Sequence, residues 1–226
     1  MANSLTLATC NISGLRNDKK RNCIFNWLKS LNYDIIFLQE THCHLKKEIR
    51  KWSSEWGAQS LWSPGSSHSK GVTVLFNPSN KYVIENETID INGRYITFDL
   101  IIGDDKYKFI NIYAPNDGYQ RVNFFNDLNS WVELDSKTLV AGDFNCTLDS
   151  EIDRLNCSGK NDTGQIDLKN IMHTKLLEDV WRRRFPDKQT FSWSRGNKFS
   201  RLDYWLISES IDNQIDKADY MPCIFF

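Results

Sequence analysis

Short apolar runs recur along this chain, and several of them break off at polar side chains. The run LVAG at residues 139–142 leads directly into Asp143, Phe144 and Asn145. Side chains two apart on an extended chain point to the same side, so we expect Asp143 and Asn145 to face one point while Phe144 turns into the core. A carboxylate and an amide held together at the end of a buried strand indicate a functional site.

Composition limits the kind of protein this can be. The chain has 226 residues, 40% of them hydrophobic, which is enough to bury a large core, and we expect a single domain over residues 1–226. Its 29 acidic and 28 basic residues nearly cancel, which argues against a uniformly basic nucleic-acid binder but leaves room for a local patch such as residues 182–188. Six cysteines without a CxxC pair, and no signal-peptide core, indicate an intracellular protein with free thiols. No apolar run approaches the roughly 20 residues of a membrane helix, so we expect no membrane partner.

Strand-like and helix-like segments alternate, and then strands crowd together. Apolar or alternating runs predict strands at residues 5–10, 33–41, 71–77, 81–89, 94–102, 107–115 and 138–142. Helical spacing predicts helices at residues 21–31, 46–56, 120–132 and 164–185, the last broken near Thr174. We expect the four strands between residues 71 and 115 to form one antiparallel meander. The Gly-Asn pair within residues 190–208 predicts a hairpin that leads into a final strand.

Polar side chains occupy equivalent places at the ends of the apolar runs. They are Asn11, Glu40, Tyr113, Asn116, Asp143, Asn145 and Asp203. In layered α/β proteins such strand ends converge on a cleft. Acids that can hold a hard divalent cation, together with amide donors and a phenol, suit the hydrolysis of a phosphate ester.

Five motifs carry a resemblance to a known family. NISGLR, LQETH, NIYAPN, GDFN and SRLDYW stand in the order and approximate spacing of the exonuclease-endonuclease-phosphatase superfamily. Within it the sequence most resembles the endonuclease domain of LINE-type, non-LTR retrotransposons. Ser13 stands where apurinic/apyrimidinic endonucleases usually have a carboxylate, which weakens a repair interpretation. We expect an α/β fold of four layers, α/β/β/α, in which two mixed, mostly antiparallel sheets pack face to face and helices cover both outer faces.

The resemblance implies a role for each residue at the centre of the site. Glu40 would bind the catalytic Mg²⁺, or Mn²⁺ in its place, with Asn11 beside it. Tyr113 would contact the scissile phosphate. Asp143 would orient or deprotonate the attacking water, and Asn145 would position the phosphate and its transition state.

The resemblance also implies residues that bind the substrate or support the reaction. Thr190 would contact a phosphate, and Asn116 of the NIYAPN motif is included among the substrate-binding residues. The hairpin at residues 194–199 would enter a groove of the duplex and place Arg195 and Lys198 on phosphates or base edges. Trp193 would either stack on the DNA or pack in the core.

The family closes its site with a Ser-Asp-His motif, in which Asp203 would hold the histidine in the right tautomer and charge state. The sequence ends at MPCIFF, about where that motif should begin. None of the four histidines of the chain has a matching context; they are His42, His44, His68 and His173. We therefore expect a truncated domain with weak or no activity.

The function implied is a Mg²⁺-dependent endonuclease that nicks double-stranded DNA and leaves a 3′-hydroxyl. A reverse transcriptase in the same polyprotein would use that end as primer, so the protein would act in the nucleus. The nearest alternatives are an abasic-site endonuclease or a phosphatase of the same superfamily. A DNA-binding module without turnover is an alternative from a different class.

Several signals also have a purely structural interpretation. Asp143 and Asn145 could form an ordinary Asx-turn, and Asp203 could only pair with Arg201 or a lysine on the surface. The arginine run at residues 182–184 is typical of a solvated helix end, although it could also touch DNA phosphates.

Glu40 and Tyr113, taken singly, favour a structural interpretation, and a zinc site is disfavoured. Glu40 alone would be a solvated surface acid, and Tyr113 alone would be a strand aromatic with an exposed hydroxyl. A structural zinc site at residues 42–44 is disfavoured, because no second ligand pair follows at finger-like spacing.

Overall fold

The computed structural model describes residues 4–157 and 160–221, which divide into two compact units. The first unit comprises residues 4–113 and the second begins at residue 114. Most of the closing MPCIFF segment, including Cys223, lies outside the described residues, so the expected truncation and the state of that thiol stay predictions. The expectation of a single domain also stays a prediction.

The first unit opens with a four-stranded sheet in the order β1-β2-β4-β3. Its strands are β1 (Leu7–Asn11), β2 (Ile35–Gln39), β3 (Ser60–Ser63) and β4 (Val72–Phe76). Strands β1 and β2 are parallel, and the other pairs are antiparallel. The parallel pair is connected through helix α1 (Asp18–Leu31), and α2 (Lys46–Trp56) follows β2.

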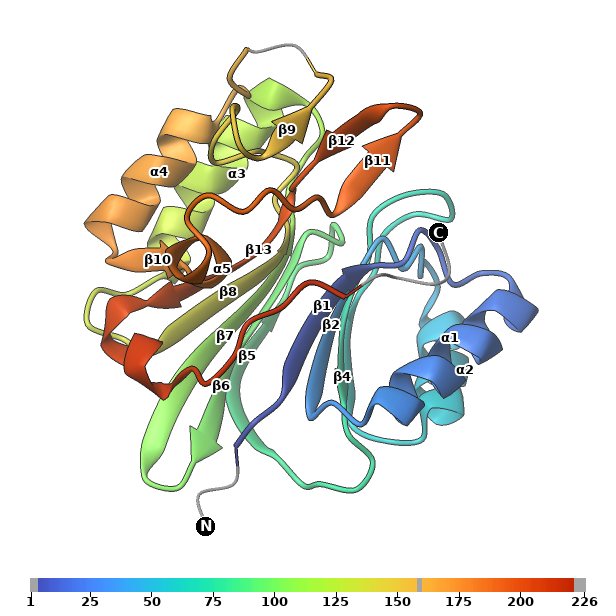
Figure 1. The fold of residues 1–226 in the computed structure, drawn as a ribbon. Helices are drawn as coiled ribbons and strands as arrows, with labels where there is room; N and C mark the ends of the chain where they lie inside the picture. The colour runs from blue at the N-terminus through green and yellow to red at the C-terminus, as the bar shows by residue number, and fades with distance from the viewer. Residues whose placement is uncertain (1–3, 158–159, 222–226) are drawn as a thin grey trace. The chain divides into compact units, whose positions relative to one another are not determined.

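The two helices cover one face of this sheet (Figure 1). Asn17 caps the first turn of α1 by accepting a hydrogen bond from the Lys20 N–H, and Asn32 ends the helix in the left-handed conformation. Both tryptophans of α2, Trp52 and Trp56, are buried, and the Trp56 indole donates to the Phe76 carbonyl at 2.9 Å. Anchored aromatic side chains thus fix both helices on the sheet.

A second group of strands in the first unit packs against the opposite face of that sheet. Strands β5 (Val83–Ile89), β6 (Tyr95–Ile102) and β7 (Asp105–Tyr113) form an antiparallel meander. The Phe37 ring of β2 lies 6.3 Å from Phe98 and 6.2 Å from Phe109, in edge-to-face contacts.

One of the four strands expected in this meander belongs elsewhere, so that prediction was wrong. Residues 71–77 contain β4, which pairs with β2 and β3. All five residues of β4 are buried, as in a strand covered on both faces, whereas β5 is largely exposed. Because β4 directly precedes β5 in the sequence, pairing of the two strands was expected. Instead β4, which is buried on both faces, lies inside the first sheet.

The second unit contains a sheet whose strands run in the order β10-β13-β8. They are β8 (Thr138–Asp143), β10 (Leu177–Asp179) and β13 (Asp203–Ser208). Its helices are α3 (Gly118–Trp131), α4 (Gln165–Thr174), α5 (Val180–Arg184) and the short 3₁₀ helix η1 (Glu209–Gln214). Helices α3 and α4 lie side by side (Figure 1). A separate small sheet has the order β11-β12-β9, with β9 (Arg154–Leu155), β11 (Trp193–Arg195) and β12 (Lys198–Ser200).

The helix predicted at residues 164–185 is broken where expected. Helix α4 ends at Thr174, Leu176 takes a left-handed conformation, and β10 follows before α5 begins. The Asp179 carboxylate caps α5 by accepting from the N–H groups of Trp181 and Arg182, both at 3.1 Å. No helix in the part of the chain that the structure describes is long and apolar enough to cross a membrane.

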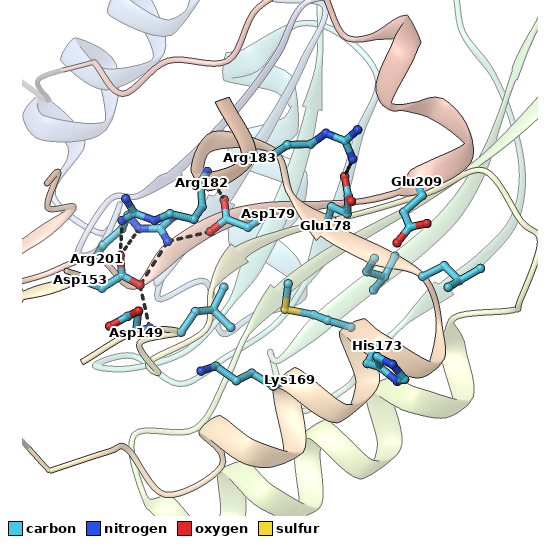
Figure 2. Close-up of a pocket in the computed structure, with 14 residues that line it drawn as sticks. Asp149, Asp153, Lys169, His173, Glu178, Asp179, Arg182, Arg183, Arg201 and Glu209 are labelled. Carbon is cyan, nitrogen blue, oxygen red and sulfur yellow. Dashed lines mark hydrogen bonds and ion pairs between the residues drawn. The ribbon is translucent and has the colours of Figure 1, made fainter. Parts of the chain in front are cut away.

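A buried ionic cluster, made of Arg201, Asp153, Asp179 and Arg182, stabilises the second unit. Arg201 and Asp153 are completely buried, and Arg201 Nε donates to Asp153 Oδ1 at 2.8 Å. Arg201 Nη2 lies 2.7 Å from Asp179 Oδ2, and Arg182 Nη2 donates to Asp153 Oδ1 at 2.6 Å. Figure 2 shows these side chains converging at the wall of a cavity of about 770 Å³. Two acids and two arginines give this Arg201 cluster no net charge.

The arginine run at the end of α5 is engaged within the second unit. Arg183 pairs with Glu178 and Asp212, and Arg184 Nη1 lies 3.0 Å from Asp212 Oδ1. Together with the place of Arg182 in the Arg201 cluster, these pairs favour the structural interpretation of the run over a contact with DNA phosphates.

Arg121 of α3 holds two loops of the second unit together. Its side chain is 5% exposed, and its guanidinium donates to three backbone carbonyls, those of Pro115, Asn116 and Thr163, at 2.8 to 3.0 Å. The chain that follows Ala114 is therefore tied to the start of α4.

Candidate active site

The predicted pair Asn11 and Glu40 comes together at one edge of the first sheet. Asn11 is the last residue of β1 and is opposite Gln39 in the parallel register. Beyond the strands the two segments stay paired, because the Ile12 N–H donates to the Gln39 carbonyl at 3.1 Å and the Gly14 N–H to the Glu40 carbonyl at 2.7 Å.

Glu40 is held by the tyrosine that was predicted to act beside it. The Tyr113 hydroxyl donates to Glu40 Oε1 at 2.6 Å, although the two residues are 73 positions apart in the sequence. Tyr113 is 4% exposed, so the interpretation of an exposed strand aromatic is wrong. The Arg94 guanidinium lies 5.0 Å from the centre of the Tyr113 ring, and its Nη1 donates to the Tyr113 carbonyl at 3.2 Å.

The loop after Asn11 is fixed by a lysine that the motifs did not reveal. Lys20 Nζ donates to the carbonyls of Ile12 and Ser13 at 2.8 and 2.9 Å. The Ser13 N–H donates to Asn11 Oδ1 at 3.1 Å. These bonds hold the Asn11 amide in place at the strand end.

His42 lies on the other side of Glu40, and sequence reasoning assigned it no role. Its Nε2 is 3.7 Å from Glu40 Oε2, and its side chain is 17% exposed. Burial lowers the pKa of His42 below its ordinary value, while the Glu40 carboxylate opposes that shift. The ring packs on Gly14, where a Cβ would lie 2.7 Å from Nδ1. The pattern around residue 42 gave no signal for this contact, because it depends on the loop that contains Gly14.

Two predicted acids of the second unit lie opposite each other on neighbouring strands. Asp143 ends β8 and Asp203 begins β13, and the antiparallel register pairs them directly. Asp143 is 6% exposed. The Asp203 N–H donates to Ser192 Oγ at 3.1 Å, and its carbonyl accepts from the Tyr220 hydroxyl. Arg201 bonds to Asp153 and Asp179, which disfavours it as a surface partner of Asp203, whereas the alternative of a surface lysine stays a prediction.

Asn145 accompanies Asp143 for a different reason from the one predicted. The chain is not extended there: Asn145 has φ of 47° and its N–H donates to Asp143 Oδ1 at 2.8 Å. This is the Asx-turn that was the structural alternative. Asn145 Nδ2 donates to the Ala114 carbonyl at 2.9 Å, which orients the amide. Phe144 is fully buried as predicted and packs edge-to-face on Tyr204.

The predicted substrate-binding residues are spread over the surface of the second unit. Arg195 and Lys198 are exposed and paired across the β11–β12 hairpin, whose turn contains Gly196 with φ of 62°. Trp193 is 41% exposed, so it does not pack in the core. Two further predicted residues are also accessible: Thr190, before β11, is partly exposed, and Asn116, after β7, is exposed.

The donor set fits a hard cation that keeps most of its water. Among residues 4–157 and 160–221 no group of three or more His, Cys, Asp or Glu side chains could hold a metal ion. Mg²⁺ in proteins is commonly bound through one or two carboxylates, with waters and substrate phosphates completing the coordination. Glu40, whose side chain is 25% exposed, and the Asn11 amide offer such oxygens.

Comparison with known proteins places these residues in a family. The sequence of residues 8–215 matches the model described as the endonuclease/exonuclease/phosphatase family. The chain belongs to this family. The membership confirms the predicted superfamily and the predicted class of hydrolytic enzyme.

Two relatives link this family member to transposons and to nucleases. An uncharacterized 149 kDa protein of transposon TX1 from Xenopus laevis is 31% identical over 195 residues, which is 85% of this chain but 15% of the transposon protein. An exodeoxyribonuclease of Bacillus subtilis is 27% identical, over 95% of this chain and 92% of that protein. The chain therefore spans a small part of one relative and nearly all of the other.

Solved structures confirm the predicted α/β fold class with two mixed sheets and helices. The AP endonuclease LMAP of Leishmania major has a TM-score of 0.74 at 17% identity and covers 92% of this chain and 80% of its own. The endonuclease domain of TRAS1, a telomere-specific non-LTR retrotransposon, has a TM-score of 0.62 at 10% identity and covers 94% of this chain and 89% of its own.

Proposed function

We propose that this chain is a Mg²⁺-dependent endonuclease domain that nicks double-stranded DNA and leaves a 3′-hydroxyl. The observation that carries the proposal is the hydrogen bond between Tyr113 and Glu40, which joins a predicted phosphate-binding group to a predicted metal ligand. Membership of a family of hydrolytic enzymes, many of them nucleases, supports it.

Glu40, with Asn11 beside it, would hold the Mg²⁺. When bound, the cation neutralises charge that builds on the phosphoryl oxygens during hydrolysis. Tyr113 keeps the Glu40 carboxylate in place through Oε1, and it would contact the scissile phosphate by turning this O–H donor toward a phosphoryl oxygen.

Asp143 and Asn145 perform the chemistry on the water and the phosphate. The Asp143 carboxylate takes a proton from the attacking water as its oxygen bonds to phosphorus. The P–O3′ bond breaks, the departing oxygen takes a proton from solvent water to become the 3′-hydroxyl, and the other strand end keeps the 5′-phosphate. Asn145 directs its amide at the phosphoryl oxygen and stabilises the charge that develops there.

The 3′-hydroxyl would serve as primer for a reverse transcriptase in the same polyprotein, with nuclear DNA as the target. The similarity to a transposon TX1 protein supports this part of the proposal. The exposed hairpin with Arg195 and Lys198 would contact the duplex, and Thr190 and Asn116 would contact its phosphates. Asp203 would orient the histidine that the family uses.

Nicking of supercoiled plasmid with Mg²⁺ tests the proposal. We expect slow nicking that stops in Asp143→Ala and Glu40→Ala, and nicks that a DNA polymerase extends directly because they carry a 3′-hydroxyl. Imidazole in solution should increase the rate if a histidine is missing from the reaction. Absence of nicking by the wild type with and without imidazole, or nicks that require end repair before extension, would refute the proposal.

The nearest alternative is an abasic-site endonuclease, and the likeness to the fold of LMAP is the observation in its favour. Ser13 in place of a carboxylate argues against it. If an abasic duplex is cleaved no faster than an intact duplex, this alternative is excluded.

A further inference from the structure

A buried histidine nitrogen beside Glu40 has no hydrogen-bond partner among the described residues. His42 Nε2 is inaccessible to solvent and lies 3.7 Å from Glu40 Oε2. Buried polar atoms are almost always hydrogen-bonded, so an unpaired one calls for an explanation. The nearest acidic group is the carboxylate that we propose to bind the metal.

We infer that His42 is a positioning residue that orients Glu40 for the cation, with its proton carried on Nε2. The inference rests on the proposed metal role of Glu40. The Tyr113 hydroxyl holds Oε1 at 2.6 Å, and His42 faces Oε2, so the two donors lie on different oxygens of one carboxylate. A carboxylate has about four lone-pair sites, so it can accept both hydrogen bonds and still bind a cation.

The distance requires only a small adjustment. An N–H···O hydrogen bond has a donor-acceptor distance of about 3.0 Å, so the observed 3.7 Å is about 0.7 Å too long. The hydrogen bond would form if the Glu40 carboxylate moved toward the imidazole by this amount when the cation binds. Donors that orient a metal ligand typically change metal affinity 10- to 100-fold when they are removed.

The surrounding backbone is built to place the imidazole there. His42 has φ of 56°, its N–H donates to the Lys70 carbonyl at 2.9 Å, and its ring lies against Gly14. Gly14 has φ of 92°, and a Cβ at this position would lie 2.7 Å from the ring nitrogen Nδ1. A left-handed conformation at a residue other than glycine costs roughly 1–2 kcal/mol, and such residues cluster at active sites and ligand-binding segments.

Binding of Mn²⁺ to the whole chain tests the inference without any measurement of turnover. Mn²⁺ serves as the probe because free and bound forms are distinguished by electron paramagnetic resonance. The variants are Glu40→Gln, His42→Leu and His42→Gln, with His173→Leu as a matched control on an exposed histidine of the second unit. Glutamine can place an amide N–H near the position of Nε2, whereas leucine cannot donate.

We expect His42→Leu to weaken Mn²⁺ binding by about tenfold or more, His42→Gln to restore most of the affinity, and His173→Leu to bind like the wild type. Circular dichroism checks that each variant folds. If His42→Leu does not fold, the comparison passes to His42→Gln and His42→Asn, since the shorter amide of asparagine does not reach Glu40.

The outcomes separate this inference from the proposed function. If Glu40→Gln binds Mn²⁺ weakly and His42→Leu binds it like the wild type, the role of His42 is overturned and the metal role of Glu40 stays intact. Where His42→Leu does not fold, unchanged binding by His42→Asn has the same meaning. Equal binding by the wild type and Glu40→Gln would overturn the metal role and the inference with it. A loss in His42→Leu that glutamine does not restore would also overturn the inference, because it would reflect packing of the ring alone.

Discussion

Removal of the Arg201 side chain should strongly destabilise the second unit. In Arg201→Met, Asp153 loses the hydrogen bonds from Nε at 2.8 Å and Nη2 at 3.2 Å, and Asp179 loses its ion pair at 2.7 Å. The Arg201 cluster then carries a net negative charge with Arg182 as its remaining cation. Breaking a buried ion pair by removing one partner costs about 3–5 kcal/mol. At about 2–4 °C per kcal/mol for a chain of this size, the melting temperature should fall by roughly 6–20 °C.

The measurement is the free energy of unfolding in urea, followed by hydrogen exchange of peptides from the second unit. Arg183→Met is the matched control, because its side chain is 48% exposed and exposed ion pairs contribute about 0–1 kcal/mol. Adding Asp153→Asn to Arg201→Met should recover part of the loss by removing the uncompensated charge. A cost for Arg201→Met no larger than that of Arg183→Met would refute the reasoning.

Three further predictions concern the second unit and the thiols. Arg195→Ala should weaken DNA binding and reduce the slope of log K against log salt concentration by about 1, without changing stability. Fluorescence anisotropy of labelled DNA over a salt series measures the slope, and an unchanged slope would exclude a phosphate contact. Arg121→Met should cost about 3 kcal/mol of unfolding free energy, because it removes the donor from the buried Pro115 carbonyl and from the partly buried carbonyls of Asn116 and Thr163. Urea denaturation checks this, and a cost below about 1 kcal/mol would contradict it. Burial raises the pKa of Cys43 and of Cys146 to about 12, so at pH 8 only about 1 in 10⁴ of each thiol is ionised, and iodoacetamide should label exposed Cys23 well before either. Peptide mass spectrometry over a time course would show the order of labelling, and equal rates for all three would contradict it.

Local patterns predicted the elements whose stability is local. The helix expected at residues 46–56 coincides with α2, because its two buried tryptophans stand four positions apart on one face. Sequence reasoning placed the start of α1 three residues late and missed Asn17, although an asparagine before a charged first turn is a typical N-cap.

Elements that depend on partners distant in the sequence could not be predicted from local patterns. Strand β3 was not predicted, because four residues carry too little pattern and its position is decided by pairing with β4. Strand β10 replaced the expected second half of a helix, because Leu177–Asp179 pair with β13. In both cases a tertiary contact overrode the local preference.

The candidate site shows the same division. The motifs identified Glu40 and Tyr113 separately, and their hydrogen bond could be expected only through the resemblance. Lys20 and His42 were missed, because their positions depend on the left-handed turn at Ser13 and Gly14. Asn145 lies beside Asp143 as expected, but an Asx-turn and not an extended chain brings the two together.

The left-handed backbone at the strand ends has a consequence for how such a domain could be altered in the laboratory. Ser13, Glu40, His42 and Asn145 all have φ between 46° and 56°, a conformation in which glycine is more stable. A library selected for heat resistance alone should therefore accumulate glycine at these positions and discard the side chains of Glu40, His42 and Asn145, to which we assign roles at the site. Selection for activity would have to accept the lower melting temperature that these four residues impose.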